Sequence, residues 1–234
     1  MPPAFALVHS PLVGQLTWSL VARELQERGL VAVTPALPTG PTVVPPYWKQ
    51  HAGAVVQALD AIPPGEPIVL VGHSGGGMLL PAIREASKRP VAAYLFVDAG
   101  IPRNGLSRLD FFEEGEAKEF RAAASDGLLP TWTEADLEEV LPDEEIRRRF
   151  VRELGPLPLA VYEEPLPVFA GWPDASCGYV QFSPVYDPAA EEARRMGMAY
   201  RRIEGGHFHM LVDPAAVASV LLELVEDLLA AAGE

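Results

Sequence analysis

The chain alternates between short apolar segments, each the length of a β-strand, and longer segments in which apolar residues recur with helical spacing. Most of the short segments lack the polar alternation of a strand with one solvated face, so we expect them to be buried on both faces. This pattern predicts an α/β fold with a doubly wound, mainly parallel, six-stranded sheet. The predicted strands are 4–8, 30–33, 68–71, 91–97, 178–182 and 199–203.

Two of the predicted helices have clear ends. The first follows the strand at 4–8 and is placed to end at Gly29, because glycine readily adopts the left-handed conformation after a helix. The last begins where Asp213 can cap it and Pro214 can occupy its first turn. Both helices carry an apolar stripe, which we expect to pack on the sheet.

The alternation of strands and helices stops between the fourth and fifth predicted strands. Two amphipathic helices are predicted there, near 109–124 and 134–154, followed by connections rich in proline. We therefore predict a small helical cap insertion at 101–168 within a core formed by residues 1–100 and 169–234. The aromatic residues of the insertion either form a small core of their own, which we favour for most of them, or roof a ligand pocket at the carboxyl edge of the sheet. They are Phe111, Phe112, Trp132, Phe150 and Tyr162.

Composition narrows the class of protein and of partner. The 234 residues are 49% apolar and 21% charged, as in compact globular domains. The formal net charge of −14 disfavours nucleic acids and anionic membrane surfaces as partners. The chain has one cysteine, no basic segment before its first apolar run and no unbroken apolar stretch of about 18 residues. We therefore expect a cytoplasmic protein that acts on a small molecule.

A strand, a glycine-flanked serine and an apolar helix follow one another near the middle of the first half of the chain. The pattern Gly-x-Ser-x-Gly occupies residues 72–76, with Ser74 at its centre. A sharp turn from strand to helix needs small residues on both sides, so that the central side chain stands clear and the next backbone N–H faces charge that develops beside it. We expect this turn to present Ser74 as a nucleophile and not merely to join a strand to a helix.

A serine hydroxyl needs a neighbouring base to act as a nucleophile at neutral pH. Of the five histidines, His207 is the predicted base, because it follows the last predicted strand at the edge of the sheet where Ser74 emerges. We interpret His209 as a packing residue at the start of a helix. The two late histidines have no third ligand at a suitable spacing, so we expect no metal site.

Three segments together resemble the α/β-hydrolase superfamily. They are Gly-His-Ser-Gly-Gly after a Val-Leu-Val strand, the opening Leu-Val-His-Ser with Trp18 after it, and Gly-Gly-His-Phe ahead of Val-Asp-Pro. The resemblance covers nearly the whole chain and is nearest to small members that include plant methylesterases and hydroxynitrile lyases. It implies a fold without the first two antiparallel strands of the superfamily, and the chain order serine, acid, histidine for the catalytic groups.

The resemblance leaves two candidates for the acid. Asp98 follows the strand after the nucleophile, a place where members of the superfamily are known to carry the acid, and we favour it. Asp187 lies beyond the fifth predicted strand, but the loop first runs through Ser-Pro-Val-Tyr before reaching it. Because a proline follows Asp187 directly, we interpret this residue as the cap of the next helix.

The resemblance also implies an oxyanion hole, in which two N–H groups bind the negatively charged oxygen of the reaction intermediate. Gly75 N–H supplies one donor. The second donor of the family is the N–H of the residue that here is Pro11, and proline has none. We expect the Ser10 hydroxyl or the Leu12 N–H to replace it, because loss of one donor lowers turnover by about a hundredfold or more.

These residues predict a serine hydrolase that cleaves a small carboxylic ester, thioester or lactone through an acyl-enzyme, with Ser74, His207 and Asp98 as the catalytic triad. No metal or cofactor is needed. Two alternatives stay open. One is a non-hydrolytic lyase, because Ser10 stands in a position that resembles the threonine of hydroxynitrile lyases. The other is a member of the same fold that binds a small molecule without turnover.

Overall fold

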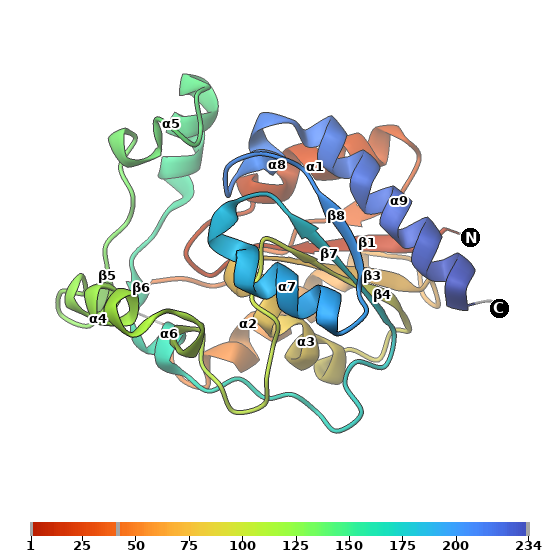
Figure 1. The fold of residues 1–234 in the computed structure, drawn as a ribbon, viewed down its shortest axis with the longest axis horizontal. Helices are drawn as coiled ribbons and strands as arrows, with labels where there is room; N and C mark the ends of the chain where they lie inside the picture. The colour runs from red at the N-terminus through yellow and green to blue at the C-terminus, as the bar shows by residue number, and fades with distance from the viewer. Residues whose placement is uncertain (1, 41–42, 233–234) are drawn as a thin grey trace.

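The computed structural model describes residues 2–40 and 43–232. Within them, six parallel strands form one sheet in the order β2-β1-β3-β4-β7-β8, so the predicted doubly wound α/β sheet is confirmed (Figure 1). The strand order reverses between β1 and β3, which is where open α/β sheets bind their ligands. The strands are β1 (Ala4–Val8), β2 (Ala32–Val33), β3 (Ile68–His73), β4 (Val91–Val97), β7 (Ser176–Gln181) and β8 (Ala199–Arg202).

Helices cover both faces of the sheet (Figure 1). On one face lie α1 (Leu16–Glu27), α8 (His209–Val212) and α9 (Pro214–Ala232), and on the other lie α2 (Tyr47–Ala58), α3 (Leu80–Ala86) and α7 (Asp187–Arg195). The predicted C-terminal end of α1 and the predicted N-terminal end of α9 are confirmed. Gly29 has a φ of +82° after α1, and Asp213 Oδ1 accepts a hydrogen bond of 3.0 Å from Ala216 N–H at the start of α9.

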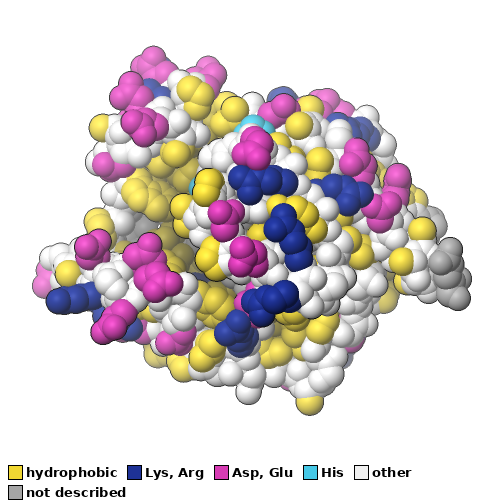
Figure 2. Space-filling view, viewed as in Figure 1, with side chains coloured by type: hydrophobic (Ala, Val, Ile, Leu, Met, Phe, Trp, Pro, Cys, Tyr) yellow, Lys and Arg dark blue, Asp and Glu magenta, His cyan; other side chains and the backbone are white. Residues whose placement is uncertain are grey.

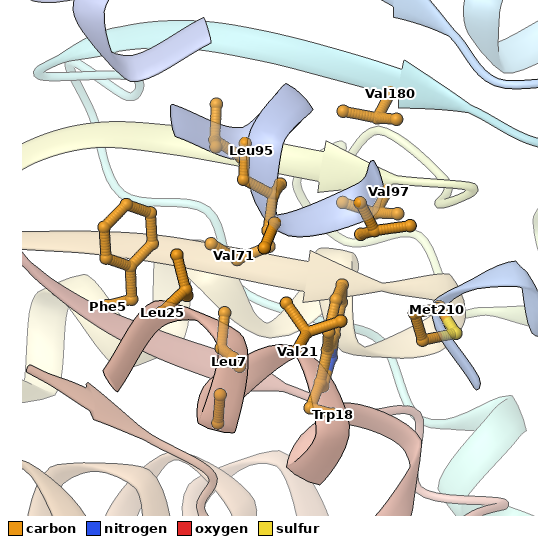
Figure 3. Packing of buried hydrophobic residues seen from close by; sticks show 14 of the residues in the cluster. Phe5, Leu7, Trp18, Val21, Leu25, Val71, Leu95, Val97, Val180 and Met210 are labelled. Carbon is orange, nitrogen blue, oxygen red and sulfur yellow. The ribbon is translucent and has the colours of Figure 1, made fainter. Parts of the chain in front are cut away.

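Both faces of the sheet are apolar, because successive side chains of each central strand enter different clusters. In β3, Val69 and Val71 belong to the cluster under α1 and α9, whereas Ile68 and Leu70 belong to the cluster under α2 and α3. Figure 3 shows the first cluster, in which Trp18 and Val21 of α1 lie next to each other and point toward the sheet. The absence of polar alternation in the sequence therefore reports burial on both faces.

The segment between β4 and β7 is built from short elements. The longest of them are the helices α4 and α5, and a two-residue strand follows each of these helices. Strands β5 and β6 pair antiparallel and form a second, two-stranded sheet. The elements are α4 (Glu114–Ala122), β5 (Leu128–Leu129), α5 (Glu144–Glu153), β6 (Leu157–Pro158) and α6 (Ala160–Glu163).

The two longer helices predicted in this segment, near 109–124 and 134–154, are wrong in extent. The first is interrupted, because the Glu116 carboxylate accepts the Glu113 N–H at 3.2 Å and so begins α4 only after Glu113. The second starts late, because a proline precedes Asp143, which caps α5. Single 3₁₀ turns at Leu109–Phe111 and Ala135–Leu137 stand where the two predicted helices were expected to begin.

The aromatic residues of this segment lie in two environments. Two of the five pack in a small cluster inside the segment, and three pack against the core of the protein. The first two are Phe112 and Tyr162, and the others are Phe111, Trp132 and Phe150. The expectation that most of them form a separate core is therefore wrong. Phe150, for example, lies with its ring centroid 4.9 Å from that of Phe208, so aromatic contacts hold this segment on the core.

The surface differs between the sheet region and the segment between β4 and β7. Figure 2 shows acidic side chains gathered over α4 and α5, with an apolar hollow between these two lobes. No helix of residues 2–40 and 43–232 is both long and apolar enough to cross a membrane.

Candidate active site

Ser74 stands at the end of β3 on a turn that only small neighbours allow. Its φ is +54°, in the left-handed region that non-glycine residues rarely adopt. A Cβ on Gly72 would lie 2.5 Å from Gly77 Cα, and a Cβ on Gly76 would lie 2.6 Å from the carbonyl oxygen of His9. The backbone therefore passes too close to itself and to β1 for any side chain at either glycine. Ser74 is half-buried and faces the carboxyl edge of the sheet.

Asp98 and His207 meet at the same edge. Asp98 follows β4, and its Oδ2 lies 3.1 Å from Nδ1 of His207. The carboxyl group is fully buried and accepts hydrogen bonds from Phe182 N–H at 2.7 Å, Ser183 N–H at 3.1 Å and the Ser183 hydroxyl at 2.6 Å. These donors from the loop after β7 fix the carboxylate, and Asp98 itself is held at a φ of +42°. The pair leaves Nε2 of His207 as the ring nitrogen that can exchange a proton with another group.

A tyrosine that the sequence analysis missed contacts both Ser74 and His207. The Tyr186 hydroxyl is 3.1 Å from Ser74 Oγ, and its ring stacks on the His207 ring at a centroid distance of 5.1 Å and an interplanar angle of 10°. In this structure, the side-chain hydrogen bond of Ser74 goes to Tyr186 and that of the His207 ring goes to Asp98. Burial raises the pKa of the Tyr186 phenol, so this hydroxyl keeps its proton at neutral pH.

His73, the residue before Ser74, holds the loop that carries the predicted base. Its Nε2–H donates a hydrogen bond of 2.9 Å to the carbonyl oxygen of His207, and the two rings lie 4.4 Å apart. Burial, followed by the proximity of His207, lowers the pKa of His73 well below its ordinary value. His73 is therefore neutral and positions His207 instead of serving as the base.

The structure places Asp187 and His209 away from these contacts. Asp187 is the first residue of α7, but its side chain does not cap that helix, so the interpretation of Asp187 as a cap is wrong. It accepts a hydrogen bond from Gln181 and forms an ion pair of 3.5 Å with Arg202. His209 begins α8 and packs beside Phe182, as expected for a packing residue. Across the described residues, no group of three or more metal-ligating side chains is present.

Several groups converge on Gly75, the residue after Ser74. A Cβ on Gly75 would lie 3.2 Å from both the Ser10 and the Tyr162 hydroxyl oxygens. These two hydroxyls are 3.2 Å apart, and Leu12 N–H donates a long hydrogen bond of 3.4 Å to Ser10 Oγ. The Leu12 N–H and the Ser10 hydroxyl, which were alternative candidates for the second oxyanion donor, are thus hydrogen-bonded to each other.

Arg108 lies behind Gly75 and was not predicted from the sequence. Its side chain is 1% exposed, and it donates hydrogen bonds to the carbonyl oxygens of Gly75 at 3.2 Å and Val161 at 2.8 Å. Burial lowers the pKa of Arg108 to about 10, so the guanidinium stays charged at neutral pH. Because Arg108 belongs to the segment between β4 and β7, it ties that segment to the turn at residues 72–76, which carries the predicted nucleophile.

An apolar cavity of about 170 Å³ lies between the segment that follows β4 and the loop after β1. The cavity reaches Leu12, next to the groups around Gly75, and could hold an apolar part of a ligand. Its lining residues are Leu12, Phe120, Ala123, Leu129, Pro130, Thr131, Trp132 and Gly155.

Comparisons with curated proteins find plant methylesterases. Putative methylesterase 14, chloroplastic, from Arabidopsis thaliana is 30% identical over 124 residues, which cover 50% of this chain and 35% of that protein. Methylesterase 17 of the same plant is 22% identical over 119 residues, which cover 49% of this chain and 43% of that protein. The aligned part is thus less than half the length of each of these relatives.

Comparisons with solved structures cover almost the whole chain. An extracellular alpha/beta-hydrolase from a Paenibacillus species matches with a TM-score of 0.77 and 19% identity, over 95% of this chain and 99% of that one. Polyneuridine aldehyde esterase matches with a TM-score of 0.70 and 17% identity, over 96% and 99% of the two chains. At such identities these two likenesses establish the fold alone. A sequence model described as the alpha/beta hydrolase family matches residues 5–220, and this chain therefore belongs to the alpha/beta hydrolase family.

Proposed function

We propose that this protein is a serine hydrolase of small carboxylic esters, thioesters or lactones, with Ser74 as nucleophile, His207 as base and Asp98 as the carboxylate that orients the base. The contact of 3.1 Å between Asp98 Oδ2 and His207 Nδ1, beside a serine on a strained strand-to-helix turn, carries the proposal. Relatives named as methylesterases favour a carboxylic ester within this class.

The reaction uses two atoms, His207 Nε2 and Ser74 Oγ, of which the second contacts the Tyr186 hydroxyl in this structure. Rotation of the Ser74 hydroxyl toward Nε2 allows the imidazole to take its proton while Oγ bonds to the carbonyl carbon of the ester. The carbonyl oxygen becomes an oxyanion. When the intermediate collapses, the bond to the leaving oxygen or sulfur breaks and the imidazolium returns the proton to it. Water, deprotonated by the same nitrogen, then releases the acid and regenerates Ser74.

Asp98, and not Asp187, is the acid in this proposal. Asp98 contacts the His207 nitrogen that faces away from solvent, whereas Asp187 is engaged with Gln181 and Arg202. A carboxylate on Nδ1 selects the tautomer in which Nε2 can accept a proton, and it stabilises the imidazolium that forms.

The oxyanion hole is formed by Gly75 N–H and the Ser10 hydroxyl in this proposal. Leu12 N–H already donates to Ser10 Oγ, and the Tyr162 hydroxyl can donate to the same oxygen. With two donors on its oxygen, the Ser10 hydroxyl directs its own proton outward and can bind the oxyanion. This contact replaces the N–H that Pro11 lacks. We expect Ser10→Ala to lower kcat for ester hydrolysis by about a hundredfold.

The direct test is covalent labelling by a phosphonate ester, followed by mass spectrometry of the intact protein and of its peptides. The wild-type protein is expected to gain one phosphonyl group on Ser74, and Ser74→Ala is expected to gain none. His207→Ala should react far more slowly, because its serine lacks a base. A folded wild-type protein that takes up no label, yet retains an added small molecule, would instead be a binding protein without turnover.

A lyase reaction is the second candidate, because the buried Ser10 hydroxyl lies beside the nucleophile turn where it could bind a substrate hydroxyl. A cyanohydrin such as mandelonitrile distinguishes the two reactions. The hydrolase proposal predicts ester hydrolysis with no release of cyanide above the uncatalysed rate. Cyanide release that depends on both Ser74 and Ser10, without ester hydrolysis, would replace it with the lyase.

A further inference from the structure

Tyr186 contacts the oxygen atom on which the proposed chemistry depends. It ends the 3₁₀ turn Pro184–Tyr186 between β7 and α7, and its hydroxyl is the side-chain hydrogen-bond partner of Ser74 Oγ at 3.1 Å. Its ring lies parallel to the His207 ring, with an interplanar angle of 10°. No step of the reaction described above uses this phenol.

We propose that Tyr186 is a further catalytic residue, whose phenol donates a hydrogen bond to Ser74 Oγ and stabilises the negative charge that builds up on this oxygen in the transition states. The inference rests on the proposed serine hydrolase reaction. In acylation, Oγ gives its proton to His207 Nε2 as the bond to the carbonyl carbon forms. In deacylation, that bond breaks and Oγ regains the proton from His207. The phenol keeps its own proton throughout.

The direction of this hydrogen bond follows from the proton inventory of the site. The proton of Ser74 must go to His207 for the reaction to start, so Ser74 Oγ can only accept from Tyr186 at that moment. The phenol is no rival base, since burial raises its pKa above the ordinary value. A hydrogen bond to an oxygen that gains charge is stronger than one to a neutral hydroxyl, so the contact favours the transition state over the resting state.

The backbone around Tyr186 is also fixed by the acid of the proposed triad. Ser183 binds Asp98 through its hydroxyl at 2.6 Å, and its carbonyl oxygen accepts the Tyr186 N–H at 3.2 Å. The four residues from Ser183 to Tyr186 thus contact Asp98 at one end and Ser74 at the other. Stacking on His207 adds a third constraint. The phenol is therefore positioned before substrate binds, as electrostatic stabilisation of a transition state requires.

The test is Tyr186→Phe, which removes the hydroxyl and keeps the stacked ring. We expect kcat for ester hydrolysis and the rate of phosphonate labelling of Ser74 to fall together by about 10- to 100-fold, the range for a hydrogen bond to a charged group. KM should change little, because the phenol contacts the enzyme's own oxygen and not the substrate. The midpoint of thermal unfolding should stay close to that of the wild type.

Tyr94→Phe is the matched control. It removes a buried tyrosine hydroxyl that also hydrogen-bonds a side chain, Asp174, but it lies outside the site. Its kcat and labelling rate are expected to equal those of the wild type. A second variant, Tyr186→Leu, removes both hydroxyl and ring, and it should lower the labelling rate further because the stack on His207 is lost as well.

The outcomes separate the inference from the function on which it rests. A wild-type protein that never labels at Ser74 overturns both. Labelling of the wild type, together with an equal labelling rate in a folded Tyr186→Phe protein, overturns the role of Tyr186 and leaves the serine hydrolase intact. A rise in KM with an unchanged kcat would show that the phenol binds substrate and does not act on Ser74 Oγ.

Discussion

The sheet with its flanking helices and the segment between β4 and β7 are organised by different forces. The central strands are fully buried on both faces, whereas the segment consists of short helices and turns with mostly exposed side chains (Figures 1 and 2). The sheet places Ser74 and Asp98 at the ends of adjacent strands. The segment contributes Arg108 and Tyr162 around Gly75. The proposed acid–base groups therefore depend on the sheet, and the surroundings of the proposed oxyanion depend on the packing of a less regular segment.

The largest expected effect tests whether Asp98, which the sheet places beside His207, is the acid of the proposed triad. Asp98→Asn should lower kcat by about 10³- to 10⁴-fold, because the amide favours the wrong tautomer of His207 and cannot stabilise the imidazolium. Asp187→Asn is the control. Its exposed partner Arg202 contributes little, so kcat should stay within about threefold of the wild type. Steady-state assays of both variants on one ester measure the two kcat values. An equal fall in kcat in both variants would contradict the choice of Asp98 as the acid.

The next effect concerns the stability of the nucleophile turn. Gly72→Ala places a methyl group 2.5 Å from the Cα of Gly77, which is backbone and cannot move aside cheaply. We expect the free energy of unfolding to fall by about 3 kcal/mol or more, measured by urea denaturation. An unchanged urea midpoint would show that the turn tolerates a wider backbone path than the structure describes.

Acid should weaken the sheet region through three buried histidines, of which His73 has a pKa well below its ordinary value because of burial. Burial lowers the pKa of His9 to about 4, and burial followed by the charge of Arg108 lowers that of His51 to about 4. The unfolded chain, with a pKa near 6.5, binds more protons in this window, so stability is complete above pH 6.5 and falls as the pH drops toward 4. His9 and His51 each account for about 3 kcal/mol at most.

Urea unfolding at several pH values between 7 and 4.5 measures this dependence. His51→Gln removes one of these three titrating groups while keeping a side-chain N–H that can reach the Pro38 carbonyl oxygen, which is the partner of His51. The variant should therefore lose less stability than the wild type on acidification. An identical pH dependence in both proteins would show that His51 does not titrate in this window.

The smallest effect is expected in the segment between β4 and β7. Gly115→Ala makes the same chemical change as in the nucleophile turn, but a Cβ on Gly115 in α4 meets no atom within 4 Å. Alanine is the better helix former and restricts the unfolded chain more, so stability should rise by about 0.5 kcal/mol. A loss of stability in urea denaturation would mean that α4 is packed more tightly around Gly115 than the structure describes.

The sequence predicts what rests on local patterns and on the order of strands. Gly72 and Gly76 flank Ser74 because the turn excludes side chains, and this requirement is visible in five residues. The meeting of Asp98 with His207 follows from strand order, since the carboxyl ends of parallel strands share one edge of the sheet. The first prediction needs only the Gly-x-Ser-x-Gly pattern, whereas the choice of Asp98 as the acid also rests on the resemblance to the superfamily.

The other groups around the proposed site depend on contacts between distant segments, which no spacing encodes. Arg108 and Tyr162 reach Gly75 only because the segment after β4 folds back over the sheet. Tyr186 lies in a loop that carries no motif, and only the strand end before it could have directed attention there. Asp187 fits a capping pattern, but tertiary partners take its carboxylate instead.

The guanidinium of Arg108 has a mechanical consequence. It donates hydrogen bonds to the carbonyl oxygen of Gly75 in the nucleophile turn and to that of Val161 in its own segment. It also carries a charge that is almost completely shielded from water. Because Arg108 and Val161 both belong to that segment, moving it away as a hinged flap would break the hydrogen bond to Gly75, and the buried charge would lose that partner. Displacement of the flap is thereby transmitted to the peptide plane beside the nucleophile, and a spectroscopic label on either part would report the movement of both.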